Sequence, residues 1–222
     1  MTRNLNTEIS NYALLVFLGA IWAASFVAIK FSNLIFNPIE VGFYRTFIGS
    51  IFLFLAVKLR GGSISLFSEN TRIYSLIGFL NASVPFTLLP YGLITLPSNI
   101  GVIILSANPF LALVLAHFFT LDEKLSLRKV IGSIIGFSGV VFAVGVEIFV
   151  SDWDSLISAI AIYVGASSYV ISNLIIRRIS HLPSDMVTMN TLFWGSIWLL
   201  PLVLIYGNLG KIEFSYIPVF AI

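Results

Sequence analysis

Ten polar side chains within otherwise apolar stretches are the residues of this chain that could bind a small solute. Their polar atoms donate or accept hydrogen bonds, and inside a membrane such groups need partners. The candidates are Trp22, Ser25, Arg45, Ser83, Thr87, Tyr91, Asn99, Ser106, Tyr169 and Asn173. The chemistry that they indicate is reversible, noncovalent binding of a polar molecule.

The clearest spacing among these candidates is a four-residue repeat of Ser83, Thr87 and Tyr91, which places the three side chains on one helix face. Pro85 and Pro90 lie in the same stretch. Each proline removes a backbone donor, so another group or water must satisfy the carbonyl that loses its helical partner. Interrupted helices often mark substrate sites in transporters. A kinked helix whose polar groups bond only to their neighbours fits this pattern equally well.

Arg45 is the only charged residue that lies clearly inside an apolar stretch. It lies about 10 Å along a helix from Pro38, at 1.5 Å per residue. An ionisable residue at such a depth is a functional candidate by default. The alternative is a structural role in which Arg45 reaches the interface or pairs with a carbonyl. For any single serine or threonine, helix packing is likewise the better interpretation.

Enzyme chemistry finds little support in the sequence. Residues 136–139 (Gly-Phe-Ser-Gly) superficially resemble the serine motif of intramembrane proteases, but Ser138 would need a histidine within hydrogen-bond reach. His117 and His181 both lie near the ends of apolar stretches. The chain has no cysteine, no HExxH, no P-loop and no dinucleotide fingerprint. We therefore expect no catalytic residue, no cofactor and no metal.

The composition requires a lipid environment for the elements that carry these residues. Of the 222 residues, 58% are hydrophobic and only 10% are charged, whereas a soluble domain has about 25% charged residues. Such a chain could not cover its surface in water, so its main partner is the lipid bilayer. The net charge of +2 comes from scattered basic residues, which argues against a nucleic-acid partner.

Seven segments are apolar and close to the length of about 20 residues that a spanning helix needs. They are Tyr12–Phe31, Glu40–Val57, Ile73–Leu93, Asn99–Phe119, Arg128–Glu147, Trp153–Ile176 and Asp185–Tyr206. An eighth apolar stretch, Tyr216–Ile222, is too short to span. In the fifth segment Gly132, Gly136 and Gly139 form a small-residue face, which predicts close packing against another helix. The sequence predicts an all-α integral membrane protein.

Lysine and arginine residues predict the orientation of these segments. Placing the N-terminus in the cytoplasm puts nine of the 12 on the cytoplasmic side, and Lys30 and Lys211 fall outside. The nine are Arg3, Lys58, Arg60, Arg72, Lys124, Arg128, Lys129, Arg177 and Arg178. This bias matches the positive-inside rule. We expect a multi-pass protein of the plasma or inner membrane with a cytoplasmic N-terminus.

The chain also repeats itself weakly. Ser25-Phe26-Val27 recurs as Ser168-Tyr169-Val170 at an offset of 143, and Pro38 recurs as Pro183 at an offset of 145. Small and aromatic residues also recur by chance in membrane helices. If the repeat is a duplication, each unit has five spans, so the second unit is inverted in the membrane. Inverted repeats are a transporter architecture.

Several motifs now support a family resemblance. Residues 19–27 (Gly-Ala-Ile-Trp-Ala-Ala-Ser-Phe-Val) resemble the first helix of EamA-type transporters of the drug/metabolite transporter superfamily. Pro38 with Tyr44-Arg45 is similar to the start of that family's second helix, and Asn108-Pro109 is similar to a pattern in its fourth. The most specific match is residues 121–126 (Leu-Asp-Glu-Lys-Leu-Ser), an acidic turn before a glycine-bearing fifth helix.

The resemblance implies ten helices in two inverted five-helix repeats and export of small metabolites. On that basis residues 1–148 form one repeat and residues 149–222 form two helices and the start of a third, so we expect the second repeat to be incomplete. The expected function is transport of a small metabolite or amino-acid-like solute by alternating access. The alternative is a non-transporting membrane subunit or a non-functional fragment. The sequence leaves the substrate and the oligomeric state open.

Overall fold

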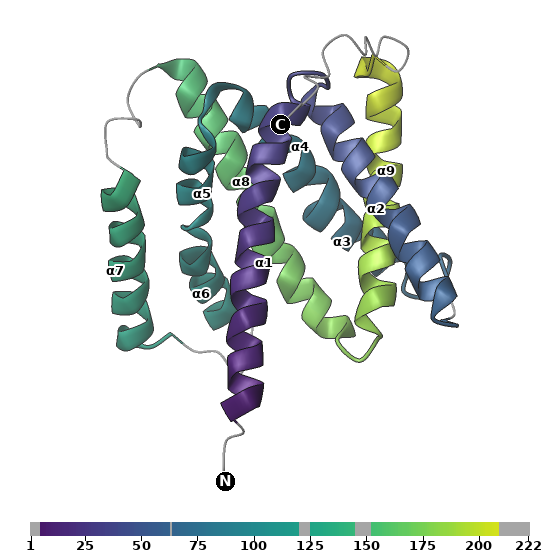
Figure 1. Ribbon diagram of the computed structural model, residues 1–222, viewed down its shortest axis with the longest axis horizontal. Helices are drawn as coiled ribbons and strands as arrows, with labels where there is room; N and C mark the ends of the chain where they lie inside the picture. The colour runs from purple at the N-terminus through teal and green to yellow at the C-terminus, as the bar shows by residue number, and fades with distance from the viewer. Residues whose placement is uncertain (1–4, 63, 120–124, 145–151, 209–222) are drawn as a thin grey trace.

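The computed structural model describes residues 5–62, 64–119, 125–144 and 152–208, and all regular structure within them is helical. This confirms the predicted all-α class. The elements are α1 (Leu5–Ser32), α2 (Pro38–Leu59), α3 (Thr71–Gly78), the π-helix η1 (Phe79–Ser83), α4 (Val84–Thr95), α5 (Ser98–Leu105), α6 (Asn108–Phe119), α7 (Leu127–Val144), α8 (Trp153–Ile176), the 3₁₀ turn η3 (Arg177–Ile179) and α9 (Ser184–Tyr206). Successive spans run in opposite directions (Figure 1).

Six segments of the described chain are long and apolar enough to cross a membrane. They are Ser10–Ser32, Pro38–Leu59, Thr71–Thr95, Ser98–Phe119, Trp153–Ile179 and Ser184–Tyr206. The helix α7 adds 18 residues, most of them apolar, which span about 27 Å at 1.5 Å per residue. All seven predicted segments are therefore helical where the structure describes them. The predicted stretch Tyr216–Ile222 lies outside the described residues.

Large apolar side chains cover the outside of the bundle. Phe52, Phe118 and Phe142 are 70%, 73% and 89% exposed. Soluble monomers rarely expose contiguous apolar patches beyond a few hundred Å², whereas a bilayer solvates such residues. The exposed surface is that of a membrane protein.

Two of the spans begin at residues whose side chains cap the first turn of the helix. At α2 the Asn37 side chain accepts the Glu40 N–H at 3.0 Å, and the Glu40 carboxylate accepts the Asn37 N–H at 2.8 Å. This is a capping box, and Pro38 occupies the first helical position, where its missing N–H costs nothing. At α8 the Asp152 carboxylate accepts the Ser155 N–H at 2.7 Å.

Two spans contain interruptions, and both lie near prolines. The third span passes from α3 through η1 into α4, which holds Pro85 and Pro90. The fourth span is divided into α5 and α6 at Ser106 and Ala107, just before Pro109. The predicted single segment Asn99–Phe119 is therefore two shorter helices, because Pro109 cannot donate to a carbonyl of the preceding turn.

The centre of the bundle is built from two long helix pairs. The helix α2 packs along α9, and α4 packs along α8, while α3 and η1 lie against α9. One apolar core joins α1, α4, α5 and α8 through residues that include Phe26, Leu93 and Ile162. A second core joins α3 to η3 and α9 around Tyr74 and Val187.

Glycines permit the closest contacts of these pairs. A Cβ at Gly92 of α4 would lie 2.4 Å from Ile162 of α8, and one at Gly78 would lie 2.7 Å from the Gly195 nitrogen of α9. Any larger residue at these positions would force the helices apart.

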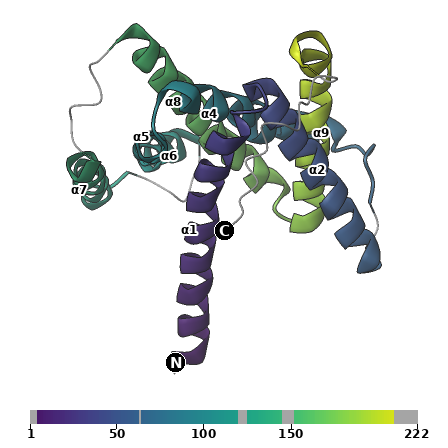
Figure 2. The same cartoon turned by 45° about the horizontal axis from the view of Figure 1, so that its top comes forward.

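The helix α7 stands at the side of the bundle (Figures 1 and 2). It meets α6 through an edge-to-face contact of the Phe137 and Phe110 rings, with centroids 6.0 Å apart. The prediction of close packing at its glycines is wrong for the structure described. A Cβ at Gly132, Gly136 or Gly139 would meet nothing within 4 Å. Gly132 and Gly136 instead line a gap of about 760 Å³ between α6 and α7.

Candidate functional site

The embedded Arg45 lies where α2, α4 and α8 meet. Its guanidinium carbon lies 4.1 Å from the centroid of the Phe86 ring of α4, a cation–π geometry. Tyr169 of α8 is close enough for an electrostatic interaction with Arg45. No hydrogen bond or ion pair joins Arg45 to the residues that the structure describes. We call Arg45, Phe86 and Tyr169 the Arg45 cluster.

Two oxygen atoms of α4 lie next to this cluster and face α2. A Cβ at Gly42 would lie 2.8 Å from the Phe86 carbonyl oxygen and 2.9 Å from Thr87 Oγ1. In a regular helix the Phe86 carbonyl would accept from residue 90, but Pro90 has no N–H. Thr87 Oγ1 is buried and has no hydrogen-bond partner among the described residues. The region around Arg45 therefore contains a guanidinium, a hydroxyl without such a partner and a carbonyl that lacks its usual helical donor.

Two small cavities reach this region. One of about 270 Å³ is lined by Ser32, Phe36, Val41, Tyr44, Arg45 and Ile48, between α1 and α2. The other, of about 310 Å³, is lined by Asn37, Pro38, Ile39, Thr87, Leu88, Tyr91 and Tyr206. The structure thus brings four predicted residues to one region: Arg45 and Tyr169 in the cluster, and Thr87 and Tyr91 beside it.

The other predicted residues lie elsewhere. Ser83 is buried and donates to the Gly195 carbonyl of α9 at 2.9 Å, so it joins two helices. Ser25 and Ser106 donate to carbonyls three residues earlier in their own helices, at 2.7 and 2.6 Å. The side chains of three further candidates lie on the exposed surface: Trp22, Asn99 and Asn173. For the three serines, the structure shows the packing and backbone bonding expected of hydroxyls in membrane helices.

Three asparagines that the sequence analysis did not select have a buried, unpaired oxygen. Asn33 donates to the Pro90 carbonyl at 2.7 Å, Asn108 to the Ala166 carbonyl at 3.0 Å, and Asn190 to the Met186 carbonyl at 3.0 Å. The Oδ1 atom of each is buried without a partner. Asn108 was visible in the sequence as part of an Asn-Pro motif, and its amide now links α6 to α8.

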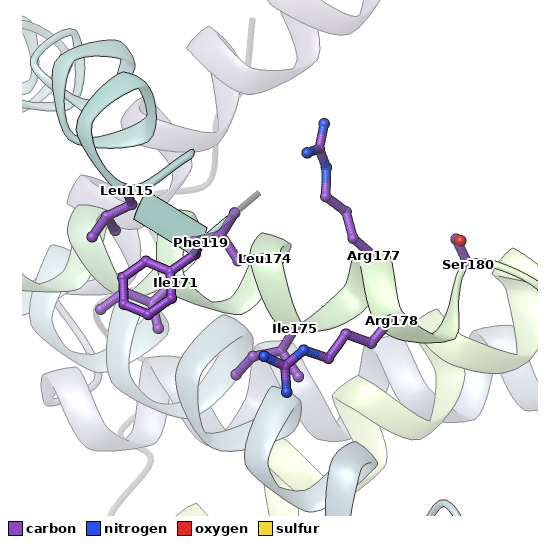
Figure 3. Close-up of a pocket in the computed structure, with 8 residues that line it drawn as sticks. All are labelled: Leu115, Phe119, Ile171, Leu174, Ile175, Arg177, Arg178 and Ser180. Carbon is purple, nitrogen blue, oxygen red and sulfur yellow. The ribbon is translucent and has the colours of Figure 1, made fainter. Parts of the chain in front are cut away.

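A larger groove opens between α6 and the second half of α8, at the end of the bundle where α1 begins (Figure 1). Its volume is about 780 Å³. The lining residues are Leu115, Phe119, Ile171, Leu174, Ile175, Arg177, Arg178 and Ser180 (Figure 3). Apolar side chains form its walls, and its polar groups gather where α8 ends.

No cluster of three or more histidine, aspartate or glutamate side chains that could hold a metal exists among the described residues. The groups described at the site are the Arg45 guanidinium, aromatic rings, amides, hydroxyls and backbone oxygens.

A bundle of apolar helices with interrupted spans and a cation at its centre defines a multi-pass membrane protein of the solute-transporting class. Residues 10–145 match the EamA-like transporter family, and the chain belongs to that family. This confirms the resemblance stated from the sequence motifs.

Two relatives are called transporters, although neither has a characterised function. The chain is 26% identical over 204 residues to the uncharacterized transporter YoaV of Bacillus subtilis (strain 168). The aligned region covers 91% of this chain and 69% of that protein. The chain is also 31% identical over 120 residues to an uncharacterized transporter of Archaeoglobus fulgidus. That aligned region covers 54% of this chain and 42% of the relative.

One solved crystal structure shares the fold. It superposes with a TM-score of 0.59 at 16% sequence identity, over 82% of this chain and 68% of the other. This similarity supports the helical architecture. The family and the relatives together identify a membrane transporter.

Proposed function

We propose that this protein exports a small metabolite or amino-acid-like solute by alternating access, and that the solute binds at the Arg45 cluster. The observation that carries the proposal is the guanidinium of Arg45, which lies among apolar helices and has no hydrogen-bond or ion-pair partner among the described residues. A charge is costly to bury unless it is paired. The Phe86 ring offsets only part of that cost, because an exposed cation–π contact is worth about 0.5–1 kcal/mol and a desolvated one about 2 kcal/mol.

A carboxylate on the solute would complete this site. Arginine holds carboxylates through two parallel hydrogen bonds, and the Phe86 ring lies against the guanidinium that would form them. An amino-acid-like solute could also use Thr87 Oγ1 and the Phe86 carbonyl, which accept from an ammonium group. These contacts support the proposed class of substrate without identifying one member.

The same charge disfavours lipophilic cations as substrates. Cation antiport commonly uses a carboxylate within a span, and in the sequence the ten acidic residues fall outside the apolar segments or near their ends. Glu40 is buried, but its two carboxylate oxygens accept the N–H groups of Asn37 and Asn208. We expect no resistance to quaternary ammonium dyes from this protein.

Alternating access would follow from an inverted duplication, which the helix contacts support. Thr46 and Thr191 lie 145 residues apart, and each donates to the carbonyl four residues earlier. Ser25 and Ser168, at the offset of 143, each donate to the carbonyl three residues earlier. The two proposed repeats meet along α2 and α9, which are equivalent helices, so a rocking motion about this pair would expose the Arg45 cluster to each side in turn.

Transport by the purified chain in proteoliposomes tests the proposal. Uptake of radiolabelled amino acids and monocarboxylates is compared with uptake of amines of matched size. We expect uptake of at least one carboxylate, a loss of tenfold or more with Arg45→Gln, and partial retention with Arg45→Lys. Arg72→Gln removes an exposed cation at the beginning of α3 and serves as the matched control.

Two results would contradict the proposal. Uptake that is unchanged in Arg45→Gln would show that the transported solute does not depend on the Arg45 cluster. Uptake of no solute in the panel, by protein that remains folded, would favour the alternative of a non-transporting membrane subunit.

A further inference from the structure

The groove between α6 and α8 has a polar end and an apolar end. Leu115 and Phe119 of α6, with Ile171, Leu174 and Ile175 of α8, form the apolar wall. Arg177, Arg178 and Ser180 lie at the other end, where the span gives way to a turn. From Ile171 to Arg178 the helix rises about 10 Å along its own axis.

The charge at the polar end comes from two arginines at the point where α8 passes into η3. Arg177 and Arg178 leave the helix end in different directions (Figure 3). Arg177 has an interaction of its own. Arg178 is exposed, and no hydrogen bond or ion pair joins it to the residues that the structure describes. Its guanidinium is therefore the group at this end that could bind a ligand.

We propose that this groove binds one anionic glycerophospholipid from the leaflet on the N-terminal side of the bundle. The phosphate group pairs with Arg178, and one acyl chain lies along the wall formed by Phe119, Ile171 and Leu174. The order of groups along the groove, from cation at the membrane surface to apolar wall toward the centre, is the order of groups in such a lipid. Basic pockets between helices are known lipid headgroup sites in membrane proteins.

Charge and shape together favour a lipid over a soluble anion. A soluble phosphate or carboxylate would use Arg178 but would leave five apolar side chains in contact with water. A neutral lipid would use the apolar wall but would leave Arg178 without an anion. Only an amphiphile with a negative headgroup matches both ends.

Native mass spectrometry of the purified 222-residue chain tests this site. The protein is released from mixed micelles that contain equal amounts of phosphatidylglycerol and phosphatidylcholine, and bound lipids are counted. We expect the wild-type chain to retain one phosphatidylglycerol in preference to phosphatidylcholine. Arg178→Gln should lower that preference about fivefold, the effect of about one basic residue at a membrane surface. Ile171→Trp, at a partly exposed wall position, should lower retention of both lipids by filling the groove.

Arg72→Gln is the matched control, because Arg72 is exposed at the same end of the bundle and does not line the groove. Equal loss of preference in Arg72→Gln and Arg178→Gln would overturn the proposal in favour of diffuse attraction to basic residues. Displacement of the lipid by millimolar glycerol phosphate would overturn it in favour of a soluble anion. An unchanged lipid count in Ile171→Trp would show that the lipid lies elsewhere. None of these results depends on transport, so they are separate from a failure at Arg45.

Discussion

At the scale of single residues, glycine positions decide how closely the helices pack. We predict that Gly92→Ala destabilises the protein by about 1–3 kcal/mol, the usual cost of overpacking, because the new Cβ would lie 2.4 Å from Ile162 and 2.6 Å from the Ser158 carbonyl. Gly136→Ala is the matched control. Its Cβ meets nothing within 4 Å, so the helix propensity of alanine should make it neutral or stabilising by up to about 1 kcal/mol. Thermal unfolding in a mild detergent measures the stability of both variants. Equal changes in the two would contradict the close contact of α4 and α8 at Gly92.

The Glu40 carboxylate gives a second residue-scale prediction. It accepts the Asn37 N–H at 2.8 Å and the Asn208 N–H at 2.6 Å, and it is only 3% exposed. Glu40→Ala leaves two donors without their acceptor, so we expect a loss of about 2–6 kcal/mol, from about 1–3 kcal/mol per unsatisfied group. Glu40→Gln keeps one acceptor oxygen and should cost about half as much. The melting temperatures should therefore fall in the order wild type, Glu40→Gln, Glu40→Ala. A melt in which both variants match the wild type would show that this contact contributes nothing.

At the scale of the element, the N-terminus of α8 predicts a pH dependence. The backbone N–H of Ser155, and then its side chain, hydrogen-bond to Asp152 and hold the pKa of that carboxyl below its ordinary value. A lowered pKa in the folded state means that the stabilisation is complete above the unfolded pKa, about 3.9, and is lost as the pH falls through the folded value. The difference in melting temperature between wild type and Asp152→Ala should therefore shrink below about pH 4. Asp152→Asn keeps a neutral cap, so its difference from Asp152→Ala should not change with pH.

The sequence predicted the spans well because apolar length and proline positions are local properties. It placed the beginning of the second span beside Pro38, where the structure has the capping box. It did not predict η1, because a π-helix depends on how the span packs against α9. Arg45 and Tyr169 lie 124 positions apart, and periodicity indicates which residues share a helix face but not which helix that face meets. Phe86 was missed for the same reason, since an apolar residue in an apolar span carries no local sign of a cation beside it.

At the scale of the whole molecule, the proposed orientation can be tested on the cysteine-free chain. We expect Ser65→Cys, in the loop between α2 and α3, to be cytoplasmic, and Leu34→Cys, in the loop between α1 and α2, to face outward. The basis is the bias of lysine and arginine toward the N-terminal side. An impermeant maleimide applied to intact cells should label Leu34→Cys alone, and both should react after lysis. Labelling of Ser65→Cys alone in intact cells would reverse the orientation.

The hydrogen bond between Asn208 and Glu40 joins two residues that are synthesised at different times. Its two residues are 168 positions apart, and ribosomes add about 5–20 residues per second. Glu40 is therefore synthesised roughly 10–30 s before Asn208, whose backbone N–H will donate a hydrogen bond to its carboxylate. Throughout that interval its second oxygen must be satisfied by water or by a lipid headgroup. The hairpin of α1 and α2 thus enters the membrane with its carboxylate still hydrated at the surface, and that hydration is given up only when α9 is inserted beside α2.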